Sequence, residues 1–529
     1  MAMVAAGWLA AGPARGAGYG LLWAKSWSSL PAVMDVATGV ATDQMGNIFV
    51  SGYSDRTDIG EDLNIVVLKY SPEGNLLWTR THNSFPGGMD LGLGVAADRQ
   101  GNCYVAGSVS ITGGASEGWL RKYDPAGNPV WTMTYASPSA GEQAVFYGVA
   151  VDPADGSVYA AGCVARGDLV QAGNGLLVRV GPGGGAPVWV ASADGHGLWD
   201  EYLAVALAPD GDVLVTGYET VSDAWGWLDS GILWRPFILL YESITTIDTD
   251  CVIARYSPGG TVRWRRTWGS ENKQTDLTKD AGHGIAVNAA DAVFVSGVAV
   301  ATPAWPINFD RWVRCYSGDG TAVPWTRQTD EGEGNHKLDV GNGCAIGPGG
   351  RVIVAGLKSV GDLGIDEAMT LEQFDPALGY PLRSDGYQCC PFSQDAGVAV
   401  AVDPGGNTIV AGWEWRLDLA GRTSIILAKY AGPASDTPVA SGLAAYPNPF
   451  DPGKAAGGTF KFANIPPGAR VSVWTLAGLL VRRVEVRGDV AAWDGRNGSG
   501  KPVAPGAYYY TVEAPGRKTA TGVIAVVRP

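Results

Sequence analysis

Four histidines are the residues of this 529-residue chain best suited to acid–base or metal chemistry. They are His82, His196, His283 and His336, and each lies between two β-rich stretches of sequence. Two histidines with an aspartate within reach could exchange protons with a substrate or bind a metal ion. Isolated histidines also occur commonly in exposed loops, so the sequence leaves both interpretations open.

Acidic residues recur at a fixed place before a repeated glycine-containing motif. The set is Asp35, Asp90, Glu142, Asp200, Asp280, Asp339 and Asp395, and a second set before a later strand is Asp62, Glu117, Asp250, Asp310 and Glu367. Such symmetric recurrence favours a structural role, in which a carboxylate accepts loop amides and fixes a turn. A ring of cation sites is the alternative, because carboxylate oxygens bind hard cations.

Two short motifs resemble catalytic or nucleotide-binding signatures but lack the required context. The stretch GASEG (Gly114–Gly118) matches G-x-S-x-G, yet a loop precedes it and a strand follows, where the nucleophile elbow needs a strand and then a helix. The stretch GRNGSGKP (Gly495–Pro502) differs from a P-loop because Pro502 replaces Ser or Thr and no helix follows. The sequence therefore predicts no catalytic residue, no metal ligand and no cofactor.

Composition narrows the classes of partner. The net charge is −14, from 38 Lys and Arg against 52 Asp and Glu, which disfavours nucleic acid as a partner. No apolar run reaches the roughly 18 residues of a transmembrane helix. Seven cysteines are too few for a disulfide scaffold and are expected to be buried, although the adjacent Cys389 and Cys390 leave a strained bridge open.

A repeat of about 55 residues dominates the sequence. Its core, GVAxDxxGNxYVAG, occurs at Gly39–Gly52, Gly94–Gly107, Gly148–Gly162, Ala204–Gly217, Gly284–Gly297, Gly343–Gly356 and Ala399–Gly412. Each core reads as two short strands around a tight turn, and a third strand follows in every copy. Four antiparallel strands in each of seven copies predict an all-β, seven-bladed β-propeller over residues 19–432.

The fourth strand contains a tryptophan in copies one to five but not in the last two copies. These residues are Trp78, Trp131, Trp189, Trp264 and Trp325, whereas copy six has Leu382 there and copy seven has no fourth strand. A stretch near the N-terminus matches the missing strand; its residues are Leu21, Leu22, Trp23, Ala24, Lys25, Ser26 and Trp27. We expect it to complete blade seven by pairing with Ser424–Tyr430, either within one molecule or by donation to the next.

These repeats resemble the bacterial β-propeller repeat family known as SBBP. The resemblance covers Leu21 to Gly432 and rests on the repeated core and the tryptophan strand. It implies the fold and leaves the function open, because propellers have many functions.

The sequence changes character after a linker at residues 433–445. Residues 446–529 alternate in β-like runs between Gly/Pro turns, which predicts a small Ig-like β-sandwich. The motif residues Tyr446, Pro447, Asn448, Pro449, Phe450, Trp493, Asp494 and Gly495 resemble the flagellar-hook-capping-type Ig-like domain that serves as a sorting signal in type IX secretion. The resemblance implies export from a Gram-negative-type bacterium, with the secretion machinery as a partner, and leaves open whether the domain is cleaved.

Residues 1–18 resemble a short secretory signal without its basic start, so they are expected to be a signal peptide or an N-terminal extension.

Copy four carries an insertion, residues 224–248, that breaks the symmetry. Its apolar residues include Trp225, Trp227, Leu228, Ile232, Leu233, Trp234, Phe237, Leu239 and Tyr241. So apolar a segment is typical of an interface with a protein partner or a second copy. The alternative is a loop that folds back over its own chain.

The sequence thus favours a secreted or cell-surface, non-enzymatic propeller for adhesion, scaffolding or self-assembly into an extracellular polymer. The alternative is an extracellular enzyme acting on polysaccharide or peptide, which would use the loop face that carries the histidines.

Overall fold

The computed structural model divides the chain into two compact units, Met1–Pro433 and Ala434–Pro529, each described here by itself. The structure describes residues 20–29, 34–56, 62–112, 115–137, 142–166, 173–195, 198–223, 247–269, 280–302, 308–329, 339–360, 366–387, 393–416, 422–432, 444–446, 450–453, 458–463, 465, 468–475, 479–487, 490–513 and 520–527. Within these ranges no helix is long and apolar enough to cross a membrane.

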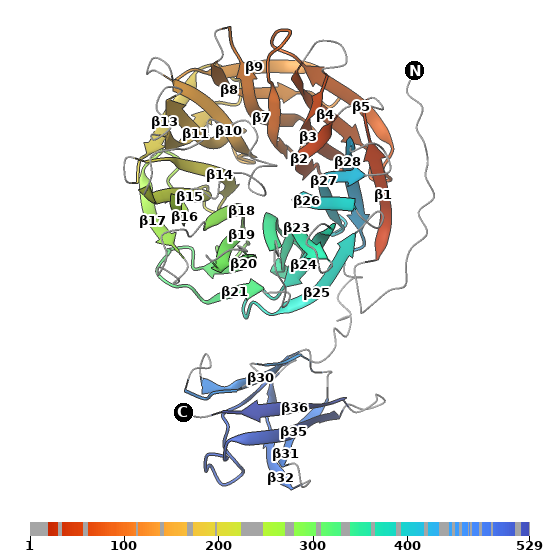
Figure 1. Ribbon diagram of the computed structural model, residues 1–529, viewed down its shortest axis with the longest axis vertical. Helices are drawn as coiled ribbons and strands as arrows, with labels where there is room; N and C mark the ends of the chain where they lie inside the picture. The colour runs from red at the N-terminus through yellow and green to blue at the C-terminus, as the bar shows by residue number, and fades with distance from the viewer. Residues whose placement is uncertain are drawn as a thin grey trace. The chain divides into compact units, whose positions relative to one another are not determined.

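The first unit is all-β and has a β-propeller fold, in agreement with the sequence analysis. Its described strands form seven antiparallel groups of four, here called blades 1 to 7, arranged around a central axis (Figure 1). Blades 6 and 7 are joined into one eight-stranded sheet by a parallel bridge between Glu367 and Gln394. The first strand of each blade lies toward the centre and the fourth lies at the rim (Figure 1).

Blades 1 to 4 follow the chain directly. Blade 1 contains β2 (Asp35–Thr42), β3 (Ile48–Asp55), β4 (Leu63–Tyr70) and β5 (Leu76–His82). Blade 2 contains β6 (Leu91–Ala97), β7 (Cys103–Ser110), β8 (Ser116–Tyr123) and β9 (Pro129–Tyr135). Blade 3 contains β10 (Glu142–Val151), β11 (Val158–Arg166), β12 (Gly173–Val180) and β13 (Pro187–Ala193). Blade 4 contains β14 (Asp200–Leu207), β15 (Val213–Asp223), β16 (Ile247–Tyr256) and β17 (Val262–Trp268).

Blades 5 and 6 repeat the pattern, and blade 7 departs from it. Blade 5 contains β18 (Ala281–Val287), β19 (Val293–Thr302), β20 (Asn308–Tyr316) and β21 (Trp325–Thr329). Blade 6 contains β22 (Asp339–Ile346), β23 (Val352–Val360), β24 (Asp366–Phe374) and β25 (Pro381–Tyr387). Blade 7 contains β26 (Ser393–Val402), β27 (Thr408–Arg416), β28 (Arg422–Tyr430) and β1 (Leu21–Trp27).

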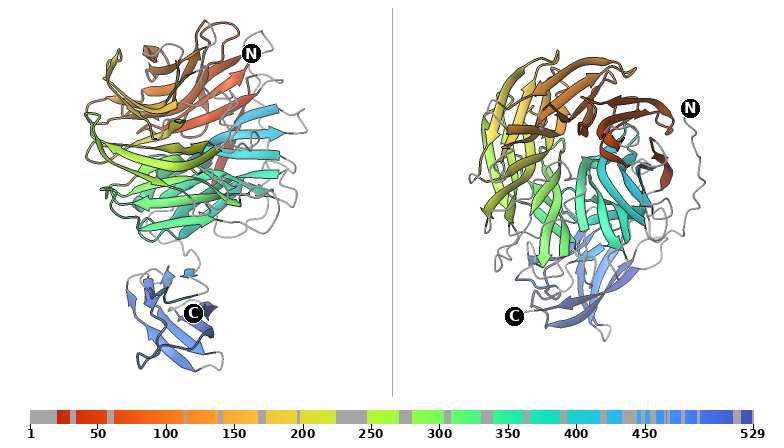
Figure 2. Two further views of the ribbon diagram at one scale, coloured as in Figure 1. Left: turned by 60° about the vertical axis from the view of Figure 1, so that its left-hand side comes forward. Right: turned by 45° about the horizontal axis from the view of Figure 1, so that its top comes forward.

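The fourth strand of blade 7 comes from the other end of the chain, as the sequence predicts. Strand β1 pairs antiparallel with β28, with Ala24 opposite Ala428 and Trp27 opposite Ile425. Both ribbon views place the two strands side by side (Figures 1 and 2). The pairing satisfies an edge of β28 that would otherwise remain open.

Apolar side chains from adjacent blades pack against each other between the blades. Ile65 and Val67 of blade 1, for example, share one core cluster with Val105 and Trp119 of blade 2. Because both faces of the inner strands are covered in this way, β4 is buried at every position. Each blade therefore depends on its two neighbours for its hydrophobic stabilisation.

The second unit consists of two four-stranded sheets around one core. One sheet has the order β29 (Ala444–Tyr446), β30 (Phe460–Ala463), β34 (Val490–Trp493) and β33 (Val486–Arg487). The other has the order β32 (Leu480–Val484), β31 (Arg470–Thr475), β35 (Gly506–Glu513) and β36 (Ala520–Val526). Phe462 of the first sheet and Val473 and Tyr510 of the second belong to the same core cluster.

Candidate functional site

The structure describes two of the four histidines, and each lies within a strand. His82 ends β5, where its ring stacks on Trp119 at a centroid distance of 5.3 Å; burial and the nearby Arg121 lower its pKa. His283 lies inside β18, so both described histidines lie within strands and not between them as expected. Its Nδ1 lies 3.3 Å from Oδ1 of Asn342, and burial lowers its pKa to about 4. His196 and His336 lie outside the described residues.

The recurring carboxylates bind loop amides and hydroxyls at the blade entrances. Asp35 accepts hydrogen bonds from the amide of Ser29 at 2.8 Å and from its hydroxyl at 3.0 Å. Asp90 accepts the amides of Ser84 and Ser110. Burial raises the pKa of Asp35, and it raises that of Asp200 to about 6. These contacts give Asp35 and Asp90 the structural role predicted for the set. Within the described ranges no group of three or more His, Cys, Asp or Glu residues could hold a metal ion.

The fourth-strand tryptophan bonds to the turn of the next blade. Nε1 of Trp78 in blade 1 donates to the carbonyl oxygen of Pro125, in the turn between β8 and β9, at 3.2 Å. Nζ of Lys69, on β4, donates to the same oxygen at 2.9 Å. Gly127 in this turn has φ +82, and a Cβ there would lie 3.0 Å from the Trp78 ring. We call this arrangement the Trp–turn contact.

The Trp–turn contact recurs around the ring. The indole donors and their carbonyl acceptors are Trp131 to Pro182 (3.2 Å), Trp189 to Pro258 (2.9 Å), Trp264 to Gly318 (2.8 Å) and Trp325 to Pro376 (3.0 Å). An arginine two residues after the tryptophan adds a further bond in three blades, from Arg80, Arg266 and Arg327 to the turn glycines. The tryptophan repeat therefore encodes adhesion between blades.

Strand β1 and its neighbour β28 supply two parts of this arrangement between blade 7 and blade 1, the lysine bond and the packing of the tryptophan ring on the turn glycine. A Cβ on Gly74, in the turn after β4, would lie 3.0 Å from the Trp23 ring and 3.1 Å from the Lys25 side chain. Lys429 of β28 donates to the carbonyl oxygen of Pro72 in the same turn at 2.9 Å. The N-terminal strand thus brings the same residue pattern as an internal fourth strand.

Blade 6 lacks the contact for a topological reason. The register places Arg383, opposite Gln373, at the tryptophan position, which corrects the assignment of Leu382 to that place. The next blade has no turn between its third and fourth strands, because β28 and β1 lie at opposite ends of the described propeller. A tryptophan in blade 6 would have no turn to bind.

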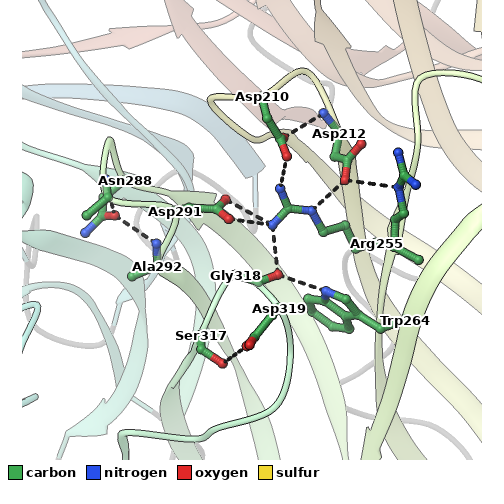
Figure 3. A network of polar contacts seen from close by, with 12 residues as sticks. Asp210, Asp212, Arg255, Trp264, Asn288, Asp291, Ala292, Ser317, Gly318 and Asp319 are labelled. Carbon is green, nitrogen blue, oxygen red and sulfur yellow. Dashed lines mark hydrogen bonds and ion pairs between the residues drawn. The ribbon is translucent and has the colours of Figure 1, made fainter.

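Between blades 4 and 5, the buried Arg255 occupies the position that Lys69 has in blade 1 (Figure 3). Arg255 of β16 has a side-chain exposure of 5% and contacts the carboxylates of three aspartates: Asp210 at 2.7 Å, Asp212 at 2.9 Å and Asp291 at 2.8 Å. The same guanidinium donates to the carbonyl oxygen of Gly318 at 2.8 Å. Charge-assisted bonds in so buried a position are stronger than neutral ones.

Two substitutions in blade 5 accommodate this arginine. Asp291 occupies a turn position where blades 1 to 4 have glycine, and it adopts a φ of +62, which is strained for a residue with a side chain. Gly318 stands where the other turns have proline, and a Cβ at Gly318 would clash with the Asp291 carboxylate at 1.9 Å. Sequence inspection missed this network, although the basic residue before the third-strand aromatic was a detectable signal.

The sorting-motif residues lie in the core and at a turn of the second unit. Phe450 and Trp493 are fully buried, with ring centroids 5.9 Å apart, and a Cβ on Gly495 would lie 3.0 Å from the Phe450 ring. Asp494 accepts the amide of Arg496 at 3.0 Å, and Tyr446 pairs with Lys461. Pro447, Asn448 and Pro449 lie outside the described residues, as do the insertion residues 224–246.

Comparison with known proteins gives matches among solved structures only. No family model and no curated protein matches the chain. PorZ, an essential bacterial surface component of the type-IX secretion system of Porphyromonas gingivalis, is 12% identical over 93% of this chain and 81% of its own, with a TM-score of 0.31. An α-L-arabinanase from Penicillium chrysogenum is 13% identical over 64% and 92%, with a TM-score of 0.41. A protein of unknown function from Dyadobacter fermentans is 12% identical over 79% and 99%, with a TM-score of 0.37. Values this low carry no argument about what the chain does.

Proposed function

We propose that the protein is a secreted or cell-surface, non-enzymatic binding or structural protein. In this proposal a seven-bladed propeller carries the binding surface. An Ig-like sandwich at residues 446–529 directs export through the secretion machinery of a Gram-negative-type bacterium.

The observation that carries the proposal is the convergence of the motif residues in the second unit. Phe450 and Trp493 are far apart in sequence, yet their rings meet in one core with Gly495 against them. The amide of Val527, after the last strand, donates to the carbonyl oxygen of Phe450 at 2.9 Å. The motif therefore fixes the end of β36, the strand that sorting machinery would have to recognise at the C-terminus.

The use of polar groups in the propeller supports a non-enzymatic role. Asp35, Asp90 and Asp200 are engaged by loop amides, and the buried His283 is neutral at physiological pH because its pKa lies near 4. A catalytic acid or base needs access to substrate as well as a pKa near the working pH, and Asp200, whose pKa burial raises to about 6, is only 3% exposed. No contact among the described residues favours the alternative of a polysaccharide- or peptide-active enzyme.

The insertion in blade 4 is proposed as the surface for a protein partner or a second copy. It lies between β15 and β16 and carries the apolar residues named above. Large apolar side chains in a loop are stabilised only when another surface covers them.

Export of the chain without Tyr446–Pro529 tests the proposal. We expect the truncated propeller to fold and to remain inside the cell, whereas the full chain reaches the medium or the outer surface. A matched pair of substitutions tests whether export requires the second unit to be folded. Phe450→Asp places a charge at a side chain with 0% exposure, and Tyr509→Asp places one at a side chain with 44% exposure. Only Phe450→Asp should block export. Normal secretion of the truncated chain would refute the sorting role.

A further inference from the structure

The first strand of every blade contains a β-bulge at the same place. In blade 1 the pairing of β2 with β3 skips Thr38, which lies between Ala37 and Gly39. The other six blades repeat this irregularity. A bulge leaves one residue out of the ladder and redirects its side chain. Because the first strands lie toward the centre of the ring (Figure 1), the seven bulge residues are placed around the axis.

The bulge residues fall into two chemical groups. Those of blades 2, 3, 4 and 7 belong to one hydrophobic cluster, which contains residues of all seven blades; they are Leu93, Tyr147, Leu203 and Val398. The bulge residues of blades 1, 5 and 6 are polar; they are Thr38, His283 and Asn342. A histidine therefore occupies a position where other blades have an aliphatic side chain.

The polar bulge residues bond to the first strand of the next blade. Oγ1 of Thr38 donates to the carbonyl oxygen of Gly92 in blade 2 at 2.7 Å. Nδ2 of Asn342 donates to the carbonyl oxygen of Gly397 in blade 7 at 2.9 Å. Nδ1 of His283 lies 3.3 Å from Oδ1 of Asn342 in blade 6. These bonds join neighbouring first strands close to the axis.

The chain of bonds from His283 to Gly397 fixes where the imidazole carries its hydrogen. A carbonyl oxygen only accepts, so the amide group of Asn342 must turn its NH2 toward Gly397 and its oxygen toward His283. That oxygen in turn requires a donor, which places the hydrogen of the neutral ring on Nδ1. Nε2 is left with a lone pair.

Nε2 of His283 has no means of stabilising a second proton. The residue as a whole is half-buried, but this nitrogen is buried and has no hydrogen-bond partner. A proton added there would create a charged donor without an acceptor, away from water. Both the missing bond and the buried charge cost free energy.

The strands that pack against β18 bring no charge that stabilises the protonated ring. These are β14, β15, β16, β19 and β22. Burial lowers the pKa of His283, and only the bond to Asn342 opposes it. At the turn end Arg255 is engaged by its aspartates, and the acidic residues lie toward the blade entrances; they are Asp200, Glu201, Glu219, Asp250, Asp280 and Asp339.

We propose that protonation of His283 destabilises the packing of blade 5 against blade 6 at the axis and makes the closed propeller sensitive to mild acid. The rim of this junction is held independently of pH in this range, because Trp325 and Arg327 of blade 5 donate to backbone carbonyls of blade 6. The acid-sensitive part is therefore the contact between the first strands, β18 and β22.

The direction of the effect follows from the pKa of His283 in the folded and unfolded states. In the folded propeller it is about 4, and in the unfolded chain it returns to the ordinary value of 6.5. The unfolded chain binds the proton more tightly, so stability is complete above pH 6.5 and is lost as the pH falls toward 4. From pH 7 to pH 5 these values predict an unfolding constant that increases about 20-fold.

Nuclear magnetic resonance of the full chain with ¹⁵N-labelled histidine tests the state of the ring. At pH 5.5 we expect one signal of a neutral imidazole with its hydrogen on Nδ1, and this signal should be missing in His283→Leu. Leucine is a suitable replacement because blades 2 and 4 have it at the same bulge position.

Unfolding of the propeller in urea at pH 7 and pH 5 tests the consequence. Other groups also titrate, among them Asp200, so the share of His283 is the difference between the unmodified protein and His283→Leu. The unfolding constant should rise about 20-fold more in the unmodified protein than in that variant. Thr38→Val is the matched control, because it removes a bond at the axis without removing a titratable group; its pH dependence should equal that of the unmodified protein.

Two results would overturn the proposal. One is the absence of any neutral histidine signal with its hydrogen on Nδ1 at pH 5.5, which needs no variant. The other is the same pH dependence of unfolding in His283→Leu as in the unmodified protein.

Discussion

Substitution of Gly74 tests the packing of β1 against blade 1, because the side chain introduced would meet the Trp23 ring. Its φ of +81 is unfavourable for any residue with a side chain, and a Cβ would lie 3.0 Å from the Trp23 ring. The left-handed conformation costs Ala about 1–2 kcal/mol. Pushing a packed ring aside adds about 1–3 kcal/mol. We therefore expect Gly74→Ala to destabilise the propeller by ~2–5 kcal/mol.

Gly87 is the matched control because it has a φ of +79 and nothing within 4 Å of its Cβ position. Gly87→Ala should cost only the conformational term, about 1–2 kcal/mol. Calorimetry of the full chain resolves the propeller transition for both variants. In a Trp23→Ala background the cost of Gly74→Ala should fall to that of Gly87→Ala, as a double-mutant cycle would show. Equal costs for the two glycines, or an unchanged cost without Trp23, would refute the contact between β1 and blade 1.

Two further predictions concern the Arg255 network and the insertion. Arg255→Met should destabilise the propeller by about 3–5 kcal/mol, because it removes the buried cation of Asp212 and leaves only the exposed Arg263 near that carboxylate. Arg263→Met, at 57% side-chain exposure and 3.6 Å from Asp212, should cost under about 1 kcal/mol. Similar thermal shifts for the two variants would contradict the assignment. The double substitution Trp234→Asp and Phe237→Asp should abolish self-association or partner binding in analytical ultracentrifugation and pull-down while the propeller stays folded. Unchanged association would show that the insertion is no interface.

The repeats predicted the strands well because each blade obeys the same local rules. The glycine that closes a turn, the alternation of apolar residues and the aspartate before the first strand are all local signals. They were enough to place β1 beside β28, because copy seven had no fourth strand and Leu21–Trp27 was a fourth-strand sequence that belonged to no other copy. The tryptophan was recognisable as a marker, but its acceptor was not, because Pro125 lies in the following repeat.

The features that sequence analysis missed depend on residues that are distant in the chain. The pairing of Arg255 depends on blade 5, where Asp291 and Gly318 replace the glycine and the proline that other blades have at these turn positions. His283 was assigned to a loop because its strand begins three residues before the repeat core, at Ala281 and not at Gly284.

The central structural claim is that the propeller closes its ring with its own N-terminal strand. Ala24 and Ala428 lie directly opposite each other in the β1–β28 pair, so cysteines at both positions are placed to form a disulfide. The decisive measurement is the mass of the oxidised Ala24→Cys, Ala428→Cys protein under denaturing, non-reducing conditions, with Ala24→Cys alone as the control. Closure within one molecule predicts a disulfide-linked monomer at every protein concentration. Covalent dimers or longer ladders that grow with concentration would contradict it and indicate strand donation between molecules.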